Sequence, residues 1–473
     1  MGAQATCQGL CRSVLNRRRF LAGTAAAAAA LGTGPFDLAS ALFAQETQPQ
    51  GTPGPGKPKV AVLFLQREKG SNLDYPTGTT EQLREIRELH LKTIRDGAAR
   101  FAVDLDIAAE PGMNVASALE QVKKAAPYGL LIVGNGLYMR GQVGHLVKNR
   151  GDIPTIVFSN VCHFIPDYVG WSKPPRTFVA ATEDIAYLAT ALRMFRALWD
   201  MEHLKLLRCP TADWRAEYQK TAESDELRAI AESYIKGATR VVEPTREHVL
   251  EAVKNYVTIR RLMEANGCNG VAVSGELCIR AKPPHANPAC LAVSRLLDDG
   301  IPAACQGDED SAKCMRLMLS LTGRTGFMGN TCADTVNNTL TISHCTSSLK
   351  LEGPAEPYRV PYMLRDLHAM GGVSMMAAWP VGREVTVVDL HGKDVIVGEG
   401  RVVANTEQIA QPPCGGCRTS VDIAVDGLAD VLAVKCQTLH HYVVLGRYLR
   451  PVVHYCKLAG LKAFDLTATT QYA

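Results

Sequence analysis

The chain has 473 residues, of which 47% are hydrophobic and 21% charged, and its formal net charge is +4. At roughly 100–200 residues per domain, this length predicts two to four domains, and the apolar content excludes an intrinsically disordered chain. Without the four arginines and one aspartate of the first 44 residues the charge falls to about +1. This near-neutral balance argues against nucleic acid as a partner, because phosphate backbones are held by a concentrated basic face.

The first residues have the pattern of an export signal. Arg17 and Arg18 stand side by side in Asn-Arg-Arg-Arg-Phe-Leu, and a mildly apolar, alanine-rich stretch follows up to Ala30. Ala39-Ser-Ala41 then resembles a cleavage site, and the stretch is too short for a stable membrane span. We predict a twin-arginine signal peptide at 1–44, the Tat translocase as a partner, and a bacterial periplasmic or secreted protein. A low-complexity alanine helix is the alternative.

After a Gly- and Pro-rich linker, the pattern is that of parallel α/β units. Val60–Leu65 reads as a buried strand, and an amphipathic helix is expected from Thr80 to Phe101. Beyond about Glu352, short alternating strands separated by turns at His391-Gly-Lys393 and Gly398-Glu-Gly400 favour antiparallel hairpins. We predict an α/β fold with two doubly wound, Rossmann-like domains followed by a smaller β-rich C-terminal domain. The predicted boundaries are 45–58 for the linker, 59–175 and 176–350 for the two α/β domains, and 351–473 for the β-rich domain.

Cysteine usage does not indicate a disulfide scaffold. Cys7 and Cys11 lie in the predicted leader, which leaves thirteen of the fifteen cysteines. Several stand in apolar runs, where cysteine behaves as a small core residue, and a disulfide connectivity is not readable from sequence. Cys414-Gly-Gly-Cys417 fits a redox pair or half of a zinc site, but no second pair stands at zinc spacing. A turn with packed thiols is the favoured interpretation.

Two acidic residues follow predicted strands that are neighbours in the sheet. Glu276 comes after an apolar run ending in Ser274-Gly275, and Asp308 follows Gln306-Gly307 after the next strand. Because the carboxyl ends of parallel strands meet at one edge of the sheet, we expect the two carboxylates to lie side by side. Such a pair binds a hard divalent metal or exchanges protons with a substrate. The alternative is that both acids only cap the helices that follow.

A histidine pair, His440-His441, opens a run near the C-terminus that precedes a predicted helix and a last strand at Lys462–Leu466. Imidazole together with two carboxylates suits Mn²⁺, Zn²⁺ or Fe²⁺. Histidines of this kind are more often packed or surface residues than ligands. Both interpretations stay open from the sequence.

Several segments between Asn269 and Asp465 carry a resemblance to a known family. They are Ala304–Asp308, Leu317–Gly326, Asn338–Cys345, Gly416–Thr419 and His440–Gly446. In these segments the chain resembles the L-fucose and L-arabinose isomerase-like superfamily of metal-dependent sugar isomerases. It departs from the family at Gln306, where relatives usually have Glu.

The resemblance implies an aldose–ketose isomerase that uses Mn²⁺, or another divalent metal, and forms homo-oligomers. It implies that a sugar or polyol is the small-molecule partner and that Glu276 and Asp308 are catalytic. It also implies that these two acids and His440 bind the metal, which stabilises an ene-diol as a Lewis acid. Because Gln306 is a neutral amide, either Glu276, Glu309 or Asp310 takes the proton, or isomerase activity is lost. Weaker substrate contacts are predicted at Gln306, His344, Arg418 and His441.

A second function stays open beside the isomerase. Gln306 and a location outside the cell favour a non-catalytic, receptor-like carbohydrate-binding protein on the same fold. Arg365 and His368 either hold sugar hydroxyls or belong to an ordinary solvated segment. Trp171 and Trp379 either stack on a sugar ring or lie in the core.

Overall fold

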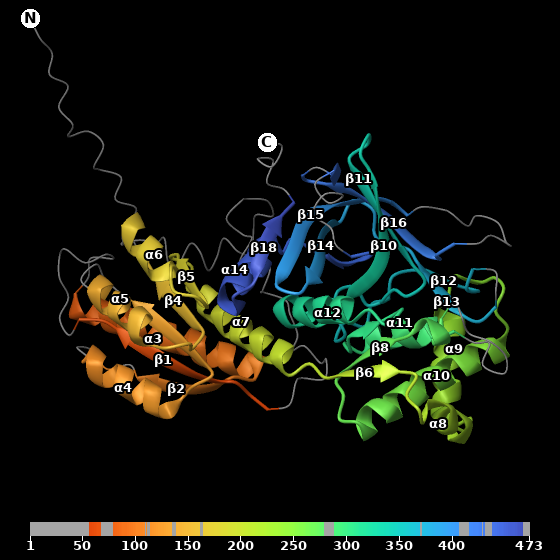
Figure 1. Ribbon diagram of the computed structural model, residues 1–473, viewed down its shortest axis with the longest axis horizontal. Helices are drawn as coiled ribbons and strands as arrows, with labels where there is room; N and C mark the ends of the chain where they lie inside the picture. The colour runs from red at the N-terminus through yellow and green to blue at the C-terminus, as the bar shows by residue number, and fades with distance from the viewer. Residues whose placement is uncertain are drawn as a thin grey trace, which may run out of the picture. The chain divides into compact units, whose positions relative to one another are not determined.

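The computed structural model describes residues 56–466, apart from 68–78, 109, 111–113, 135–138, 161–163, 279–287, 369–370, 406–415, 428 and 431–437 (Figure 1). The predicted signal peptide at 1–44 therefore lies outside the described residues. So do most of the predicted linker and Cys414.

The N-terminal unit is a parallel sheet with the strand order β2-β1-β3-β4-β5. The central strands β1, β3 and β4 are apolar and buried on both faces, as expected for strands covered by helices. The strand order reverses between β1 and β3, which is the arrangement of doubly wound sheets. The strands are β1 Lys59–Leu65, β2 Asp104–Ala108, β3 Gly129–Gly134, β4 Thr155–Ser159 and β5 Thr177–Ala181, and the helices are α3 Thr80–Phe101, α4 Val115–Ala125, α5 Arg140–Asn149 and α6 Ile165–Ser172.

Helix α3 has the bounds that the sequence predicted. Thr79 accepts from the backbone N–H of Gln82, whose side chain accepts in turn from the N–H of Thr79, so a capping box begins the helix. Ala102 takes a left-handed conformation and ends it.

One correction concerns β5, which pairs in parallel with β4 and completes this sheet. The predicted boundary at 175/176 was therefore placed one strand too early.

His90 on α3 provides a test of stability against pH. It is 4% exposed and packs near Phe64 and Phe158, with ring centroids 6.4 and 5.6 Å away. Burial lowers the pKa of His90 to about 4, whereas the unfolded value is about 6.5. The unfolded chain therefore binds more protons between these two pH values, and stability is lost as the pH falls from about 6.5 to 4.

We expect His90→Leu to flatten the dependence of unfolding on pH in this window. In the wild type, His90 lowers the free energy of unfolding by at most about 3 kcal/mol when the pH falls to 4. Thermal melts at a series of pH values measure the difference, and His145→Leu on α5, an exposed histidine of the same unit, serves as the control. Equal pH dependence in wild type and His90→Leu would contradict this assignment.

The second unit is built around a small parallel sheet with the order β6-β8-β9. Thr245 accepts from the N–H of His248 and is the N-cap of α10, as the sequence predicted. β8 pairs in parallel with β9, so the two strands expected to be neighbours are neighbours. The elements are α7 Tyr187–Glu202, β6 Leu206–Cys209, α8 Trp214–Lys220, α9 Asp225–Gly237, β7 Arg240–Val241, α10 Arg246–Ala265, β8 Gly270–Val273, the 3₁₀ turn Gly275–Leu277, α11 Cys290–Asp298, β9 Ala303–Ala304 and α12 Glu309–Thr322.

The β-rich part is a closed antiparallel barrel in which β14, β17, β10, β11, β16 and β15 pair in a ring, and β18 adds to β15 in parallel. Strands β10 and β11 were predicted to belong to the second α/β domain, so this part of the layout needs correction. The elements are β10 Gly326–Asp334, β11 Thr339–His344, β12 Tyr362–Arg365, β13 Ser374–Ala377, β14 Glu384–His391, β15 Asp394–Asn405, β16 Thr419–Val425, β17 His440–Leu445, α14 Leu449–Ala459 and β18 Lys462–Asp465.

Gly398-Glu-Gly400 is not the turn that its sequence predicted. Strand β15 continues through it, and the single hairpin turns between His391 and Asp394. A Cβ added at Gly400 would lie 2.3 Å from the carbonyl oxygen of Ala424 on the paired strand. Glycine is needed there because two backbones approach closely.

The second unit and the barrel share one hydrophobic core. Leu227 and Val249 of the helical layer belong to the same buried cluster as Phe327, Val387 and Val443 of the barrel. Strand β12 also pairs with β7 of the second unit, in parallel. The barrel therefore shares its larger core with the second unit, and among the residues that the structure describes only the smaller cluster of Leu340, Ile396, Ala429 and Leu466 belongs to the barrel part alone.

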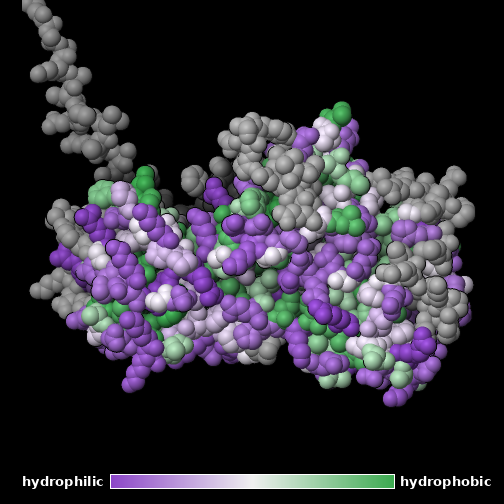
Figure 2. Space-filling view, viewed as in Figure 1, coloured by the Kyte–Doolittle hydropathy of each residue, from purple (hydrophilic) through white to green (hydrophobic). Residues whose placement is uncertain are grey.

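The surface shows no broad apolar face in the view of Figure 2, where hydrophobic residues lie in small groups among hydrophilic ones. None of the helices in the described part of the chain is long and apolar enough to cross a bilayer.

Candidate active site

Strand β8 ends in a tight turn that leaves Glu276 at the surface. The side chain of Ser274 accepts from the backbone N–H of Glu276 at 3.2 Å, so Ser274 is the residue that caps this turn. The carboxylate of Glu276 makes no ion pair or side-chain hydrogen bond with a residue of the described ranges, whereas Asp308 does. The strands that precede the two acids are neighbours as expected, and the proximity of the two carboxylates stays a prediction.

Asp308 follows the neighbouring strand β9 and lies at the N-terminus of α12. Gln306 and Gly307 both have positive φ, +58° and +73°, and this sharp turn presents Asp308 to the helix. Oδ1 of Asp308 accepts from the N–H of Ser311 at 2.9 Å, so the helix-capping alternative is correct for this oxygen.

The second oxygen of Asp308 has a different partner. Oδ2 lies 2.9 Å from Nδ1 of His440, the first residue of β17, and 2.9 Å from the hydroxyl of Ser311. Burial raises the pKa of Asp308, but the hydrogen bonds with His440 and Ser311 outweigh it and hold the pKa below its usual value. An ionised carboxylate only accepts, so we assign the Nδ1 proton of His440 as the donor.

His440 is 5% exposed, and its other ring nitrogen, Nε2, has no hydrogen-bond partner among the residues described. With the proton on Nδ1, this nitrogen carries a lone pair. Nε2 can therefore accept a proton or bind a metal. Asp308, which is hydrogen-bonded to Nδ1, orients the ring and fixes its tautomer.

His344, at the end of β11, lies beside His440 with the two rings 5.5 Å apart and nearly perpendicular. Its Nδ1 is 3.0 Å from the hydroxyl of Thr346, and its Nε2 is buried without a hydrogen-bond partner in the described part of the chain. Burial lowers the pKa of His344 to about 4. Two imidazoles with unused Nε2 atoms thus meet at this place.

The remaining predicted contacts lie elsewhere or are occupied. Arg418 is buried in an ion pair with Asp366, which rules out a simple role in holding substrate. His441 is buried with Nε2 4.0 Å from a carboxylate oxygen of Asp389, a group whose pKa burial raises to about 6. Gln306 is exposed in its turn.

The alternative bases Glu309 and Asp310 are also engaged. Glu309 pairs with Arg208, while Asp310 pairs with Lys313 at 2.6 Å. Arg365 donates to both oxygens of Glu243 and does not offer its guanidinium to a sugar. Trp171 and Trp379 are 4% and 1% exposed, so the core interpretation of both is correct.

Two thiols and an imidazole lie together beside His344, a cluster that the sequence did not predict. Cys345, His368 and Cys417 each offer one ligand atom, and these atoms lie within 4.8 Å of one another. The hydrogen bond with Cys345 lowers the pKa of the Cys417 thiol to about 4, despite burial, while it raises the pKa of Cys345. The sequence had shown Cys417 only as part of a short Cys-x-x-Cys motif.

A second pair of thiols lies nearby, since the sulfur atoms of Cys278 and Cys305 are 3.4 Å apart. These two cysteines follow strands β8 and β9, as Glu276 and Asp308 do. None of the ten cysteines in the described ranges forms a disulfide. The carboxyl edge of the small sheet is therefore rich in sulfur.

This donor set does not fit the Mn²⁺ ion that the family resemblance implies. Mn²⁺ prefers oxygen ligands, but Glu276 is exposed and both oxygens of Asp308 are already used by neighbouring groups. Apart from the exposed carboxylate of Glu276, the unused donor atoms that the described residues offer at this place are imidazole nitrogens and thiol sulfurs. Such ligands favour a softer metal.

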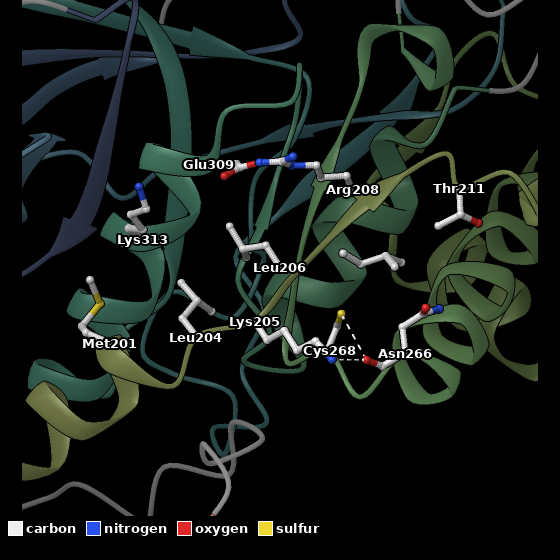
Figure 3. A pocket seen from close by; sticks show the side chains of 11 residues that line it. Met201, Leu204, Lys205, Leu206, Arg208, Thr211, Asn266, Cys268, Glu309 and Lys313 are labelled. Carbon is white, nitrogen blue, oxygen red and sulfur yellow. Dashed lines mark hydrogen bonds and ion pairs between the residues drawn. The ribbon is translucent and has the colours of Figure 1, made fainter.

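A surface pocket of about 610 Å³ lies beside β6 and does not contain the Asp308–His440 pair. Figure 3 shows Arg208 extended toward Glu309 on one side of this pocket and Lys205 beside Asn266 on another. Arg208 and Glu309 pair with each other, Lys205 donates to the carbonyl oxygen of Asn266, and Lys313 pairs with Asp310 outside the lining. The pocket adds no unused catalytic group to the site.

Comparison with known proteins leaves the family open. No protein-family model and no curated protein matches the chain. Among solved structures, a sugar ABC transporter (sugar-binding protein) from Bacillus halodurans matches 57% of this chain and 89% of its own, with 12% identity. The TM-score is 0.15, which is too low to carry an argument about fold or ligand.

Proposed function

We propose that this protein is an aldose–ketose sugar isomerase, or a close derivative, in which His440 moves the proton. The observation that carries the proposal is the Asp308–His440 contact at 2.9 Å, with Nε2 of His440 buried and without a partner in the described ranges. A polyol is the substrate class of the family that the sequence resembles. The twin-arginine motif supports placing this activity outside the cytoplasm.

The chemistry needs a base that is aligned and unprotonated. Moving a carbonyl from C1 to C2 removes the proton on C2 and places negative charge on oxygen. Nε2 of His440 accepts this proton and returns it to C1, while the hydroxyl proton of O2 passes to O1. Asp308 keeps the ring in the required tautomer and stabilises the imidazolium that forms. Burial on β17 fixes the ring, so little reorganisation is needed when the proton moves.

Glu276 has a smaller part in this proposal than the sequence suggested. Its carboxylate is exposed and makes no hydrogen bond with Asp308 or His440, so we assign the role of base to His440. This assignment also removes the difficulty posed by Gln306, because the proton acceptor no longer has to come from the turn that follows β9.

Proton exchange at C2 is the direct test. The purified protein is incubated in heavy water with a panel of aldopentoses, aldohexoses and 6-deoxy sugars, and loss of the C2 proton signal is followed by NMR. We expect exchange with at least one sugar. Absence of exchange across the panel would contradict the proposal, and sugar binding by calorimetry without exchange would support the receptor-like alternative.

A further inference from the structure

Three side chains from separate strands converge next to His344 and are not used by the proposed base. Cys345 follows β11, Cys417 precedes β16, and His368 follows β12. Strands β11 and β16 pair with His344 opposite Thr419, so the sheet register itself places the two cysteines at the same end of the barrel. One ligand atom of each side chain lies within 4.8 Å of the other two.

The position of His368 is fixed by a buried ion pair. Arg418 donates from Nε to the carbonyl oxygen of Asp366 at 2.7 Å and also pairs with its carboxylate, which ties the segment of His368 to that of Cys417. His368 has a φ of +50°, a left-handed conformation that is unfavourable when a side chain is present. Surrounding structure holds it there, with Nε2 3.8 Å from Sγ of Cys417.

We propose that Cys345, His368 and Cys417 bind one Zn²⁺ ion and leave its fourth coordination position open. Two thiolates and one imidazole form a donor set of catalytic zinc sites, in which water or substrate completes the tetrahedron. Tetrahedral bonds of about 2.0–2.3 Å place ligand atoms roughly 3.5–3.8 Å apart. The sulfur–nitrogen distance already has this value, and atoms within 4.8 Å of each other need shifts of about 1 Å at most.

An independent observation indicates a ligand at the same place. His344 is 2% exposed, precedes Cys345 and has a buried Nε2 without a hydrogen-bond partner in the part of the chain described. A buried polar atom without a hydrogen-bond partner destabilises the folded protein. Water or a substrate oxygen on the open position of the zinc supplies the missing partner.

The zinc site stands independently of the proposed isomerase and does not need a sugar to be detected. If both are present, the ion lies beside His440 and acts as the Lewis acid for the oxygen that becomes negative. It then takes the place of the Mn²⁺ that the family resemblance implies.

Cobalt is the probe for this site. The full chain is stripped of metal and titrated with Co²⁺ alone, and absorbance is recorded. We expect one equivalent to give thiolate-to-cobalt charge transfer in the near ultraviolet and the visible bands of a tetrahedral ion, both of which one equivalent of Zn²⁺ removes. Cys417→Ser and Cys345→Ser should weaken cobalt binding at least about 100-fold.

Matched variants separate this site from the proposed base and from misfolding. Cys332→Ser replaces an exposed cysteine on β10 and should leave the cobalt spectrum unchanged. His440→Gln should also retain it, because His440 is not a ligand in this proposal. His368→Gln should keep the charge-transfer band and shift the visible bands, since both thiolates remain.

Three results would overturn the proposal. They are cobalt binding without thiolate charge transfer, an unchanged spectrum in Cys417→Ser, and thiol titration that finds Cys345 and Cys417 joined in a disulfide in the protein as purified. Circular dichroism of each variant shows whether lost binding reflects lost structure. Loss of sugar exchange with an intact cobalt site would count against the isomerase only.

Discussion

We expect His440→Gln to lower the rate of C2 proton exchange by about 10²–10⁴-fold, the usual contribution of a positioned general base. Glutamine retains a polar group of similar length but cannot accept the proton. The decrease should appear in kcat and not in KM, because the lost interaction belongs to the step in which the proton moves. Exchange measured by NMR on the best substrate of the panel gives both constants.

Asp308→Asn tests the second member of the pair. An amide offers a hydrogen-bond donor to Nδ1, which favours the wrong tautomer of His440 and removes the charge that stabilises imidazolium. We expect a large loss in this variant too, and the double variant should be little worse than His440→Gln alone, because the two residues act as one unit.

A matched control exists on the protein surface. His391 has its Nδ1 3.5 Å from a carboxylate oxygen of Asp310, which reproduces the same pair of groups where the histidine side chain is 53% exposed. His391→Gln should leave proton exchange unchanged. An equal loss in this control, or full activity in His440→Gln, would remove His440 from the mechanism.

Asp308 could be predicted from the sequence as a site residue, because a local pattern of apolar and small residues marks where a strand ends. Asp308 follows an apolar run and a small turn, and the carboxyl end of β9 is where a parallel sheet exposes side chains. Its partner His440 comes from a barrel strand 132 residues later. The family resemblance predicted that both residues bind one metal ion, but not that they contact each other directly.

The thiol and imidazole group was not predictable in the same way. Cys345, His368 and Cys417 lie on three segments that meet only through the pairing of β11 with β16 and the Arg418–Asp366 ion pair. The nearest motif, Cys-x-x-Cys, directed attention to neighbours in sequence, whereas the partners of Cys417 are distant in sequence.

The sequence also did not predict which sheet β10 and β11 join. Strands β10 and β11 follow α12 directly, so the sequence order favoured a continuation of the α/β unit. Tertiary pairing decides otherwise: Asn330 on β10 pairs with His440 on β17, and His344 on β11 pairs with Thr419 on β16. Period and propensity identify a strand, but they do not identify the sheet that it joins.

A second large effect is expected at Asp298, the last residue of α11. This carboxylate is 1% exposed, and its Oδ1 accepts from the N–H groups of Leu349 and Lys350 at 2.6 and 3.1 Å and from the hydroxyl of Ser348 at 2.8 Å. Burial raises the pKa of Asp298, and the hydrogen bonds, which lower it, only partly offset this effect. The segment that follows Cys345 is therefore anchored to the second unit by one side chain.

Asp298→Ala leaves buried N–H donors without an acceptor, and we expect it to lower the free energy of unfolding by about 3–5 kcal/mol. Asp298→Asn keeps one acceptor oxygen and should lose clearly less. Asp299→Ala is the control. The half-buried carboxylate of Asp299 pairs with Arg295 and accepts from the hydroxyl of Tyr256 at 2.7 Å, so we expect a loss clearly smaller than that of Asp298→Ala.

Denaturant unfolding followed by circular dichroism measures the stability of all three variants. Hydrogen exchange and cobalt binding then show which part of the chain is destabilised. Because Asp298 holds the segment between β11 and β12, its removal should also weaken the cobalt site at Cys345, while the His90 region keeps its protection from hydrogen exchange. Equal destabilisation by Asp298→Ala and Asp299→Ala would show that this buried carboxylate does not anchor the barrel to α11.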